Sequence, residues 1–281
     1  GRAVTRGGRP GRRVLTATAV TAAAAAAVAI VAMTSSGGGA PAHPGPVTDQ
    51  QVSMATARFL VRAAAGITHE AAMRPSPDQF VYSKVESATG SGAISTNENW
   101  LSADGARLGY ARSSDQAGSK VSPCTLAQAR ARRGCFPEAG FIAGMPASPG
   151  RLLAYLNRVK ITNTDVLPGA SWGTAWKAND IGKAVDYLMP TTDLLPAEQA
   201  ALYRLIARTP GFTIVPHIAD AAGRVGVGVK WTFGGGATVI ILDPRTYAYL
   251  GDASWLTRSP GVILRSALVK VAIVDRAGQQ P

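Results

Sequence analysis

The chain has 281 residues and a formal net charge of +12, yet only 16% of its residues are charged and 6% are aromatic. Its 31 glycines and 18 prolines favour a loop-rich domain over a helical bundle. Five of the positive charges precede residue 14. The tight basic cluster beyond them, Arg130, Arg132 and Arg133, lacks the interleaved aromatic residues of a single-strand-binding surface, so no nucleic-acid partner is predicted.

Residues 14–33 contain no charged side chain and are long enough, as a helix, to cross the hydrocarbon core of a bilayer. Their high alanine content makes them only weakly apolar. Arginines precede this segment and no acidic residue occurs before Asp49, which predicts a cytoplasmic amino end. These arginines are Arg2, Arg6, Arg9, Arg12 and Arg13. We therefore expect a single-pass protein of the cell membrane with an extracytoplasmic carboxy-terminal domain.

A cleaved signal peptide is the alternative, because a basic start, an apolar core and a small-residue site at residues 40–42 are also present. Against it, the apolar run exceeds the usual length of about 15 residues for a signal core. Under both interpretations, the chain after this segment lies outside the cytoplasm. Because the chain begins with Gly, we expect a further cytoplasmic segment to precede it.

The predicted organisation has four parts. Residues 1–13 form a basic cytoplasmic tail, 14–33 a transmembrane helix, 34–50 a Gly- and Pro-rich linker, and 51–281 an extracytoplasmic domain. Within the domain, apolar residues at three- and four-residue steps predict a helix over residues 51–65. Alternation then predicts strands over 80–85, 94–102 and 107–112, with the aromatic side chains on the buried face.

Residues 113–147 interrupt this alternation, and the sequence predicts a long loop there. Cys124 and Cys135 lie within it, with ten residues between them. Because the exported compartment is oxidising, we expect a disulfide between them. Free thiols remain an alternative, and so does metal binding, although no histidine is close in sequence.

Three helices are predicted next, from Pro149, over residues 174–188, and from Pro196 to about Pro210. Period-two patterns then predict strands over 212–218, 225–231, 238–242, 247–250 and 262–274. The expected fold class is α+β, with about eight antiparallel strands in a strongly curved half-barrel, similar to that of lipoprotein carriers, and a helical insert in its concave face.

The order of these elements, together with short motifs, resembles a family of single-pass membrane proteins from high-GC Gram-positive bacteria, which are often encoded beside extracytoplasmic-function sigma factors. The motifs are RLLAYL at 151–156, ALYRLIA at 201–207, PG at 210–211, GRVGV at 223–227 and DPRT at 243–246. The resemblance covers roughly residues 75–255 and the anchor. It implies no catalytic residues, and the expected shape is also similar to that of the periplasmic sensor that restrains sigma-factor release.

No constellation typical of catalysis or cofactor binding is found. His43, His69 and His217 lack ligand partners at helical or hairpin spacing, and the glycines at 234–236 do not open a helix after a strand. We therefore expect neither an enzyme nor a cofactor. The first hypothesis is a membrane-anchored sensory or binding domain for an apolar ligand or a partner segment. A lipid or lipoprotein carrier released by signal cleavage is the second, and an exported hydrolase the third.

Overall fold

The computed structural model of the chain describes residues 53–67, 74–121, 145–159, 174–190, 194–256, 261–262 and 264–281. The predicted anchor, the five arginines before it, the linker, and Cys124 and Cys135 lie outside these residues, so the disulfide stays a prediction. None of the helices within the described residues is long and apolar enough to cross a membrane.

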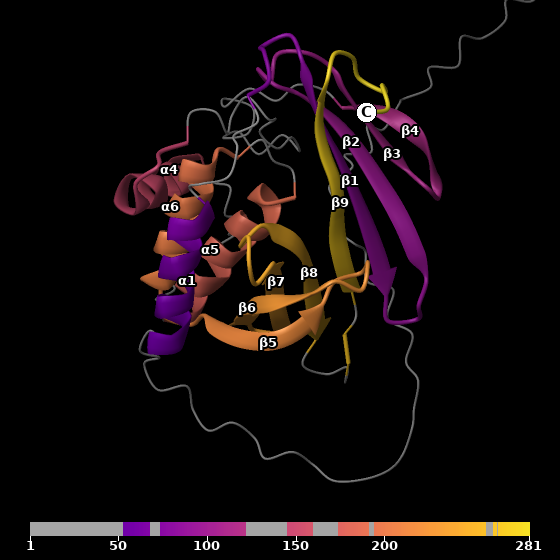
Figure 1. Cartoon of the computed structure of the whole chain (residues 1–281). Helices are drawn as coiled ribbons and strands as arrows, with labels where there is room; N and C mark the ends of the chain where they lie inside the picture. Colours follow the sequence, from indigo (N-terminus) through magenta and orange to yellow (C-terminus); the bar gives the residue numbers. More distant parts are fainter. Residues whose placement is uncertain are drawn as a thin grey trace, which may run out of the picture. The chain divides into compact units, whose positions relative to one another are not determined.

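The described part of the chain contains four helices and nine strands (Figure 1). The helices are α1 (Met54–Gly66), α4 (Pro149–Val159), α5 (Thr174–Leu188) and α6 (Pro196–Ala207). The strands are β1 (Phe80–Thr89), β2 (Ile94–Ser102), β3 (Gly109–Ser113), β4 (Gln116–Val121), β5 (Thr213–Ala219), β6 (Val225–Phe233), β7 (Gly236–Leu242), β8 (Tyr249–Leu256) and β9 (Leu264–Val274).

All nine strands form one antiparallel sheet in the order β4-β3-β2-β1-β9-β8-β7-β6-β5. The last strand, β9, thus lies between the two hairpin series and joins them. This confirms the α+β class and the helical insert, because α4, α5 and α6 fall between β4 and β5 in the chain. Figure 1 shows β5 and β6 running across the view while β1 and β9 run along it, consistent with a curved sheet.

The strand β4 was not predicted, because its residues fall in the expected loop 113–147. Its sequence, QAGSKV, has no alternation of large apolar side chains, and the described residues of this strand are exposed. It forms because its backbone pairs with the edge of β3, to which a tight turn connects it. Lack of a buried face removes the pattern from which a strand is recognised.

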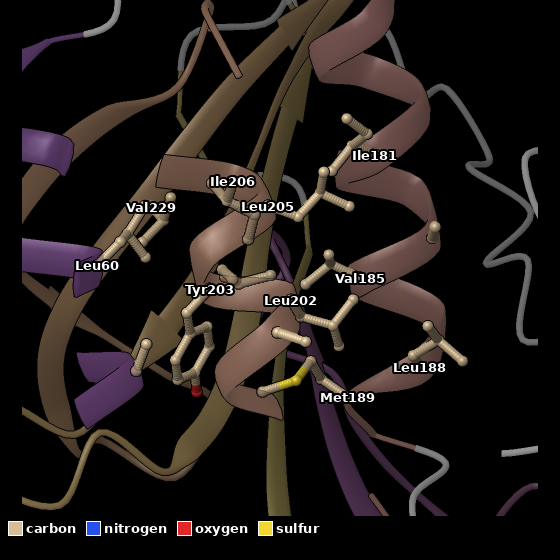
Figure 2. Packing of buried hydrophobic residues seen from close by; sticks show 14 of the residues in the cluster. Leu60, Ile181, Val185, Leu188, Met189, Leu202, Tyr203, Leu205, Ile206 and Val229 are labelled. Atoms are coloured by element: carbon tan, nitrogen blue, oxygen red, sulfur yellow. The ribbon is translucent and has the colours of Figure 1, made fainter. Parts of the chain in front are cut away.

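The helices form a layer over one face of the sheet, which we call the inner face; α5 packs on β6, and α1 and α4 pack on α6. Buried side chains of α5 and α6 interdigitate there, with Leu60 of α1 and Val229 of β6 against them (Figure 2). Gly182 of α5 lies directly against the ring of Trp231 of β6; an added Cβ would be 2.3 Å from a ring atom. This close approach holds α5 on the sheet.

The opposite, outer face has two smaller apolar clusters. One contains Phe80, Tyr82, Trp100 and Val274, and the predicted burial of strand aromatics is confirmed there. The final residues of the chain lie over it, since the indole nitrogen of Trp100 donates to the carbonyl of Gln279 at 2.6 Å. The other cluster is centred on β7 and β8, which have Val239, Ile241, Leu250 and Ala253 on this face.

Candidate functional site

The inner face continues past the helix-covered strands onto β9, β1 and β2. Ile240 of β7 belongs to the helix-packed core and is paired with Asp252 of β8. Asp252 in turn contacts Ser266 of β9, and Ser266 is paired with Ser87 of β1. Because residues paired across antiparallel strands share a face, these four side chains trace one surface from the core outward.

We call the outer part of this surface the β9–β1–β2 inner face. It consists of Val81, Ser83, Val85 and Ser87 of β1, Asn97, Asn99 and Leu101 of β2, and Ser266, Leu268, Val271 and Ile273 of β9. Val81, Ser83 and Ser266 are buried, and the others are half-buried. Apolar side chains alternate there with small polar ones that carry no charge, a composition suited to contact with an apolar molecule.

A buried polar cluster lies at the boundary between this surface and the helices. Asp252 accepts hydrogen bonds from the hydroxyls of Ser266 and, at 3.2 Å, Tyr249. Its backbone nitrogen donates to the Ser266 hydroxyl at 3.1 Å. Asp186 of α5 lies near enough for the charge of Asp252 to affect its pKa, and its Oδ1 atom is buried without a hydrogen-bond partner. We call Asp186 and Asp252 the acid pair.

The pKa values of the acid pair are shifted upward. Burial raises the pKa of Asp186 well above its usual range, and the charge of the nearby Asp252 raises it further. Burial also raises the pKa of Asp252, although hydrogen bonds from Ser266 and Tyr249 oppose this. The pair therefore retains protons in the folded state at pH values where both groups would ionise in the unfolded chain.

This makes the folding stability dependent on Asp186 and on pH. For an acid whose pKa rises on folding, the native state binds more protons than the unfolded state, so stability falls as pH rises above about 4, the unfolded value. We expect Asp186→Asn, which removes this titration, to be nearly neutral at pH 4 and increasingly stabilising toward pH 8. Urea unfolding at several pH values measures the difference.

Exposed Asp78 offers the matched control. Because Asp78 is exposed, Asp78→Asn should change the free energy of unfolding by no more than about 0.5 kcal/mol. A flat difference for Asp186→Asn as well would mean that the Asp186 carboxyl is not held in an environment that favours its proton.

Next to the acid pair, β8 and β9 stop pairing. The paired residues of these two strands are Ala253 with Arg265 and Ser254 with Leu264. Beyond it, the guanidinium of Arg224 donates to the carbonyls of Leu250 in β8, at 2.8 Å, and Leu268 in β9, at 3.0 Å.

Asp220 holds Arg224 in this position. The carboxylate of Asp220 is fully buried; it accepts from the Arg224 backbone at 2.9 Å and from the side chain at 2.7 Å. Gly223 has a φ of +79°, which lets the turn close between the two residues. An acidic residue followed by a glycine three positions later is typical of a β-turn, and this turn forms, with the Gly223 nitrogen donating to the carbonyl of Asp220 at 3.2 Å. The bridging role of Arg224 was missed, because a turn pattern does not reveal which strands the side chain reaches.

The three histidines considered as ligands do not form a site within the described residues. His217 is exposed in the irregular part of β5 with a φ of +54°, and His43 and His69 lie outside the described residues. Gly234 and Gly235 form the β6–β7 turn, and Gly236 begins β7. Asp243 accepts from the backbone nitrogens of Arg245 and Thr246, which lowers its pKa and defines the turn before β8. Within the described ranges, no three His, Cys, Asp or Glu side chains are grouped to hold a metal ion.

No protein-family model matches the chain, and no curated protein matches it either. Among solved structures, the chain is similar to one described as "Crystal structure of MucB". The two chains are 15% identical with a TM-score of 0.32, and the match covers 82% of this chain and 61% of that chain. A likeness this weak identifies neither a family nor a function.

Proposed function

We propose that the chain is a membrane-anchored extracytoplasmic binding domain that holds an apolar ligand on the β9–β1–β2 inner face. The observation that carries this proposal is the half-buried state of apolar side chains such as Val85 and Val271 on a surface that continues the core. Half-buried apolar area can still be removed from water by a ligand, which stabilises the complex by roughly 25 cal/mol per Å².

The sequence supplies the setting for this domain. The uncharged segment 14–33 and the arginines before it support a cytoplasmic amino end and a single membrane pass. The resemblance to membrane proteins encoded beside extracytoplasmic-function sigma factors supports a role in such a regulatory system, and a curved sheet with helices on its inner face fits a half-barrel. A partner-protein segment is the other occupant that this surface suits.

A photoactivatable long-chain alcohol tests the binding surface in the full chain reconstituted in bilayer nanodiscs. We expect it to label peptides of β1 and β9, and we expect Val271→Asp to reduce that labelling about tenfold, because a charge placed against the apolar chain costs more than 1.4 kcal/mol. Peptide mapping by mass spectrometry gives the measurement.

Val269 provides the control, because it lies two residues away in β9 and is 41% exposed. Val269→Asp should leave the labelling unchanged. Equal labelling in all three proteins, or none in the wild type, would contradict a ligand site on this face. A mature chain that starts at His43, found by mass spectrometry of the amino terminus, would replace the anchored domain with a released carrier.

A further inference from the structure

The last residues of the chain lie across the outer face after β9 has ended. In the sheet, β9 pairs with β1 as far as Val274, which lies opposite Phe80. Beyond this point the chain turns at Gly278, whose φ is +83°, and the indole nitrogen of Trp100 in β2 donates to the carbonyl of Gln279 at 2.6 Å (Figure 1). We call residues 276–281 the carboxy-terminal strap.

The surface under the strap is built from aromatic side chains of three neighbouring strands. The ring centroid of Trp100 is 5.1 Å from that of Tyr82 and 5.5 Å from that of Tyr110. Trp100 is 0% exposed and Tyr82 is 2% exposed. The guanidinium of Arg112 lies 5.8 Å from the Trp100 ring. Trp, Tyr and Arg are the residues that contribute most often to protein–protein binding, so this composition is typical of an interaction surface.

A buried carboxylate completes the surface. Glu98 accepts hydrogen bonds from the Tyr82 hydroxyl at 2.6 Å, from Arg112 Nε at 2.8 Å and, at 3.2 Å, from the side-chain amide of Gln280 in the strap. Burial raises the pKa of Glu98, but these hydrogen bonds outweigh burial and hold the pKa below its usual value. Trp100 thus offers a donor and Glu98 an acceptor, and they pair with consecutive residues of the strap. We call Tyr82, Glu98, Trp100 and Tyr110 the outer aromatic site.

The strap covers this site with little apolar contact of its own. Its sequence, RAGQQP, has no large apolar side chain, and apart from the half-buried Gln279 its residues are exposed. Its last residue, Pro281, accepts from Lys270 Nζ at 3.0 Å, in an exposed hydrogen bond. Because β9 pairs only up to Val274, release of the strap leaves the sheet intact. Such a segment opens at a lower free energy than the core, and its opening exposes Trp100.

We propose that the outer aromatic site is a peptide-binding site, which the strap fills in the free chain and an extended segment of a partner protein fills in a complex. The partner segment presents a main-chain carbonyl to Trp100 and, at the next residue, a side-chain donor to Glu98, as the strap does. The strap then competes with the partner, and its opening sets the apparent affinity. This site lies on the face opposite the ligand surface proposed above and does not depend on it.

A fluorescein-labelled peptide with the strap sequence, RAGQQP, tests the proposal by fluorescence anisotropy on the full chain in bilayer nanodiscs. Gly278→Ala should weaken the strap, because alanine rarely adopts a φ of +83°. We expect this variant to bind the peptide about tenfold more tightly than the wild type does. Gly92→Ala is the matched control, since Gly92 has the same φ, lies between β1 and β2, and has open space where its Cβ would be. It should bind the peptide as the wild type does.

A second peptide, RAGQEP, places a carboxylate where the strap presents its amide to Glu98. It should bind Gly278→Ala at least tenfold more weakly than RAGQQP, because like charges then meet. Trp100→Phe, added to Gly278→Ala, should also weaken binding of RAGQQP by removing the indole donor. Should that double variant fail to fold by circular dichroism, the altered peptide decides the outcome, because it leaves the protein unchanged.

Three results would overturn the peptide site. They are equal affinity for the two peptides, no tighter binding by Gly278→Ala than by Gly92→Ala, and dimers of Gly278→Ala in mass photometry, which would assign the released strap to a second copy of this chain. Labelling of the inner face by the long-chain alcohol should be the same in Gly278→Ala as in the wild type, so the two proposals succeed or fail separately.

Discussion

Replacing Arg224 with methionine is expected to lower the free energy of unfolding by about 3 kcal/mol, because it leaves the fully buried carboxylate of Asp220 without its charged partner. It also removes the donors for the carbonyls of Leu250 and Leu268, where β8 and β9 no longer pair with each other. Urea unfolding of the full chain in nanodiscs, followed by tryptophan fluorescence, measures this change.

Arg265→Met is the matched control, because Arg265 is an exposed residue of β9 and the same atoms are exchanged. It should change stability by no more than about 0.5 kcal/mol. The double variant Asp220→Asn with Arg224→Met should recover part of the loss, since it no longer buries an unpaired charge. If Arg224→Met were no more destabilising than Arg265→Met, the bridge between β8 and β9 would not contribute to stability.

The elements that the sequence predicts well are those whose apolar periodicity is local. Pro149 and Pro196 begin helices as expected, and α5 spans residues 174–188 as predicted. Hairpins such as β6–β7 follow from alternation around a glycine-rich turn. In each case the signal and the structure that it predicts lie within about 15 residues.

The arrangement of the sheet depends on pairings that have no local signal. Strand β9 pairs with β1 across most of the described chain, as in Phe80 with Val274. Alternation predicts both strands but not that they are neighbours, because either could pair with the strand next to it in sequence. The place of β9 at the centre of the sheet therefore required the structure.

The sequence did not reveal the candidate site either, because its residues come together without a local signal. Asp186 follows Val185 in a helix whose apolar stripe the sequence does reveal, and Asp252 follows Gly251 in a strand. Each alone resembles an ordinary surface carboxylate. The available signal was an acidic residue beside buried positions, and it does not reveal that the charge of Asp252 acts on Asp186 in the folded chain.

Replacing Gly251 with alanine is the second large effect that we expect. The added Cβ would lie 2.1 Å from the backbone oxygen of Ser266 and 3.0 Å from the Cα of Ala267. Backbone atoms cannot rotate away as a side chain can, so β8 and β9 must separate, at a cost of about 3 kcal/mol. Urea unfolding measures the loss, and hydrogen exchange at the Asp252 amide should accelerate as its bond to Ser266 lengthens.

Gly234→Ala separates this effect from a general loss of glycine flexibility. Gly234 lies in the β6–β7 turn with open space where its Cβ would be, so its substitution should change stability by no more than about 0.5 kcal/mol. Unchanged stability and exchange in Gly251→Ala would mean that the two strands are not in contact at this point and that Asp252 lacks the support of Ser266.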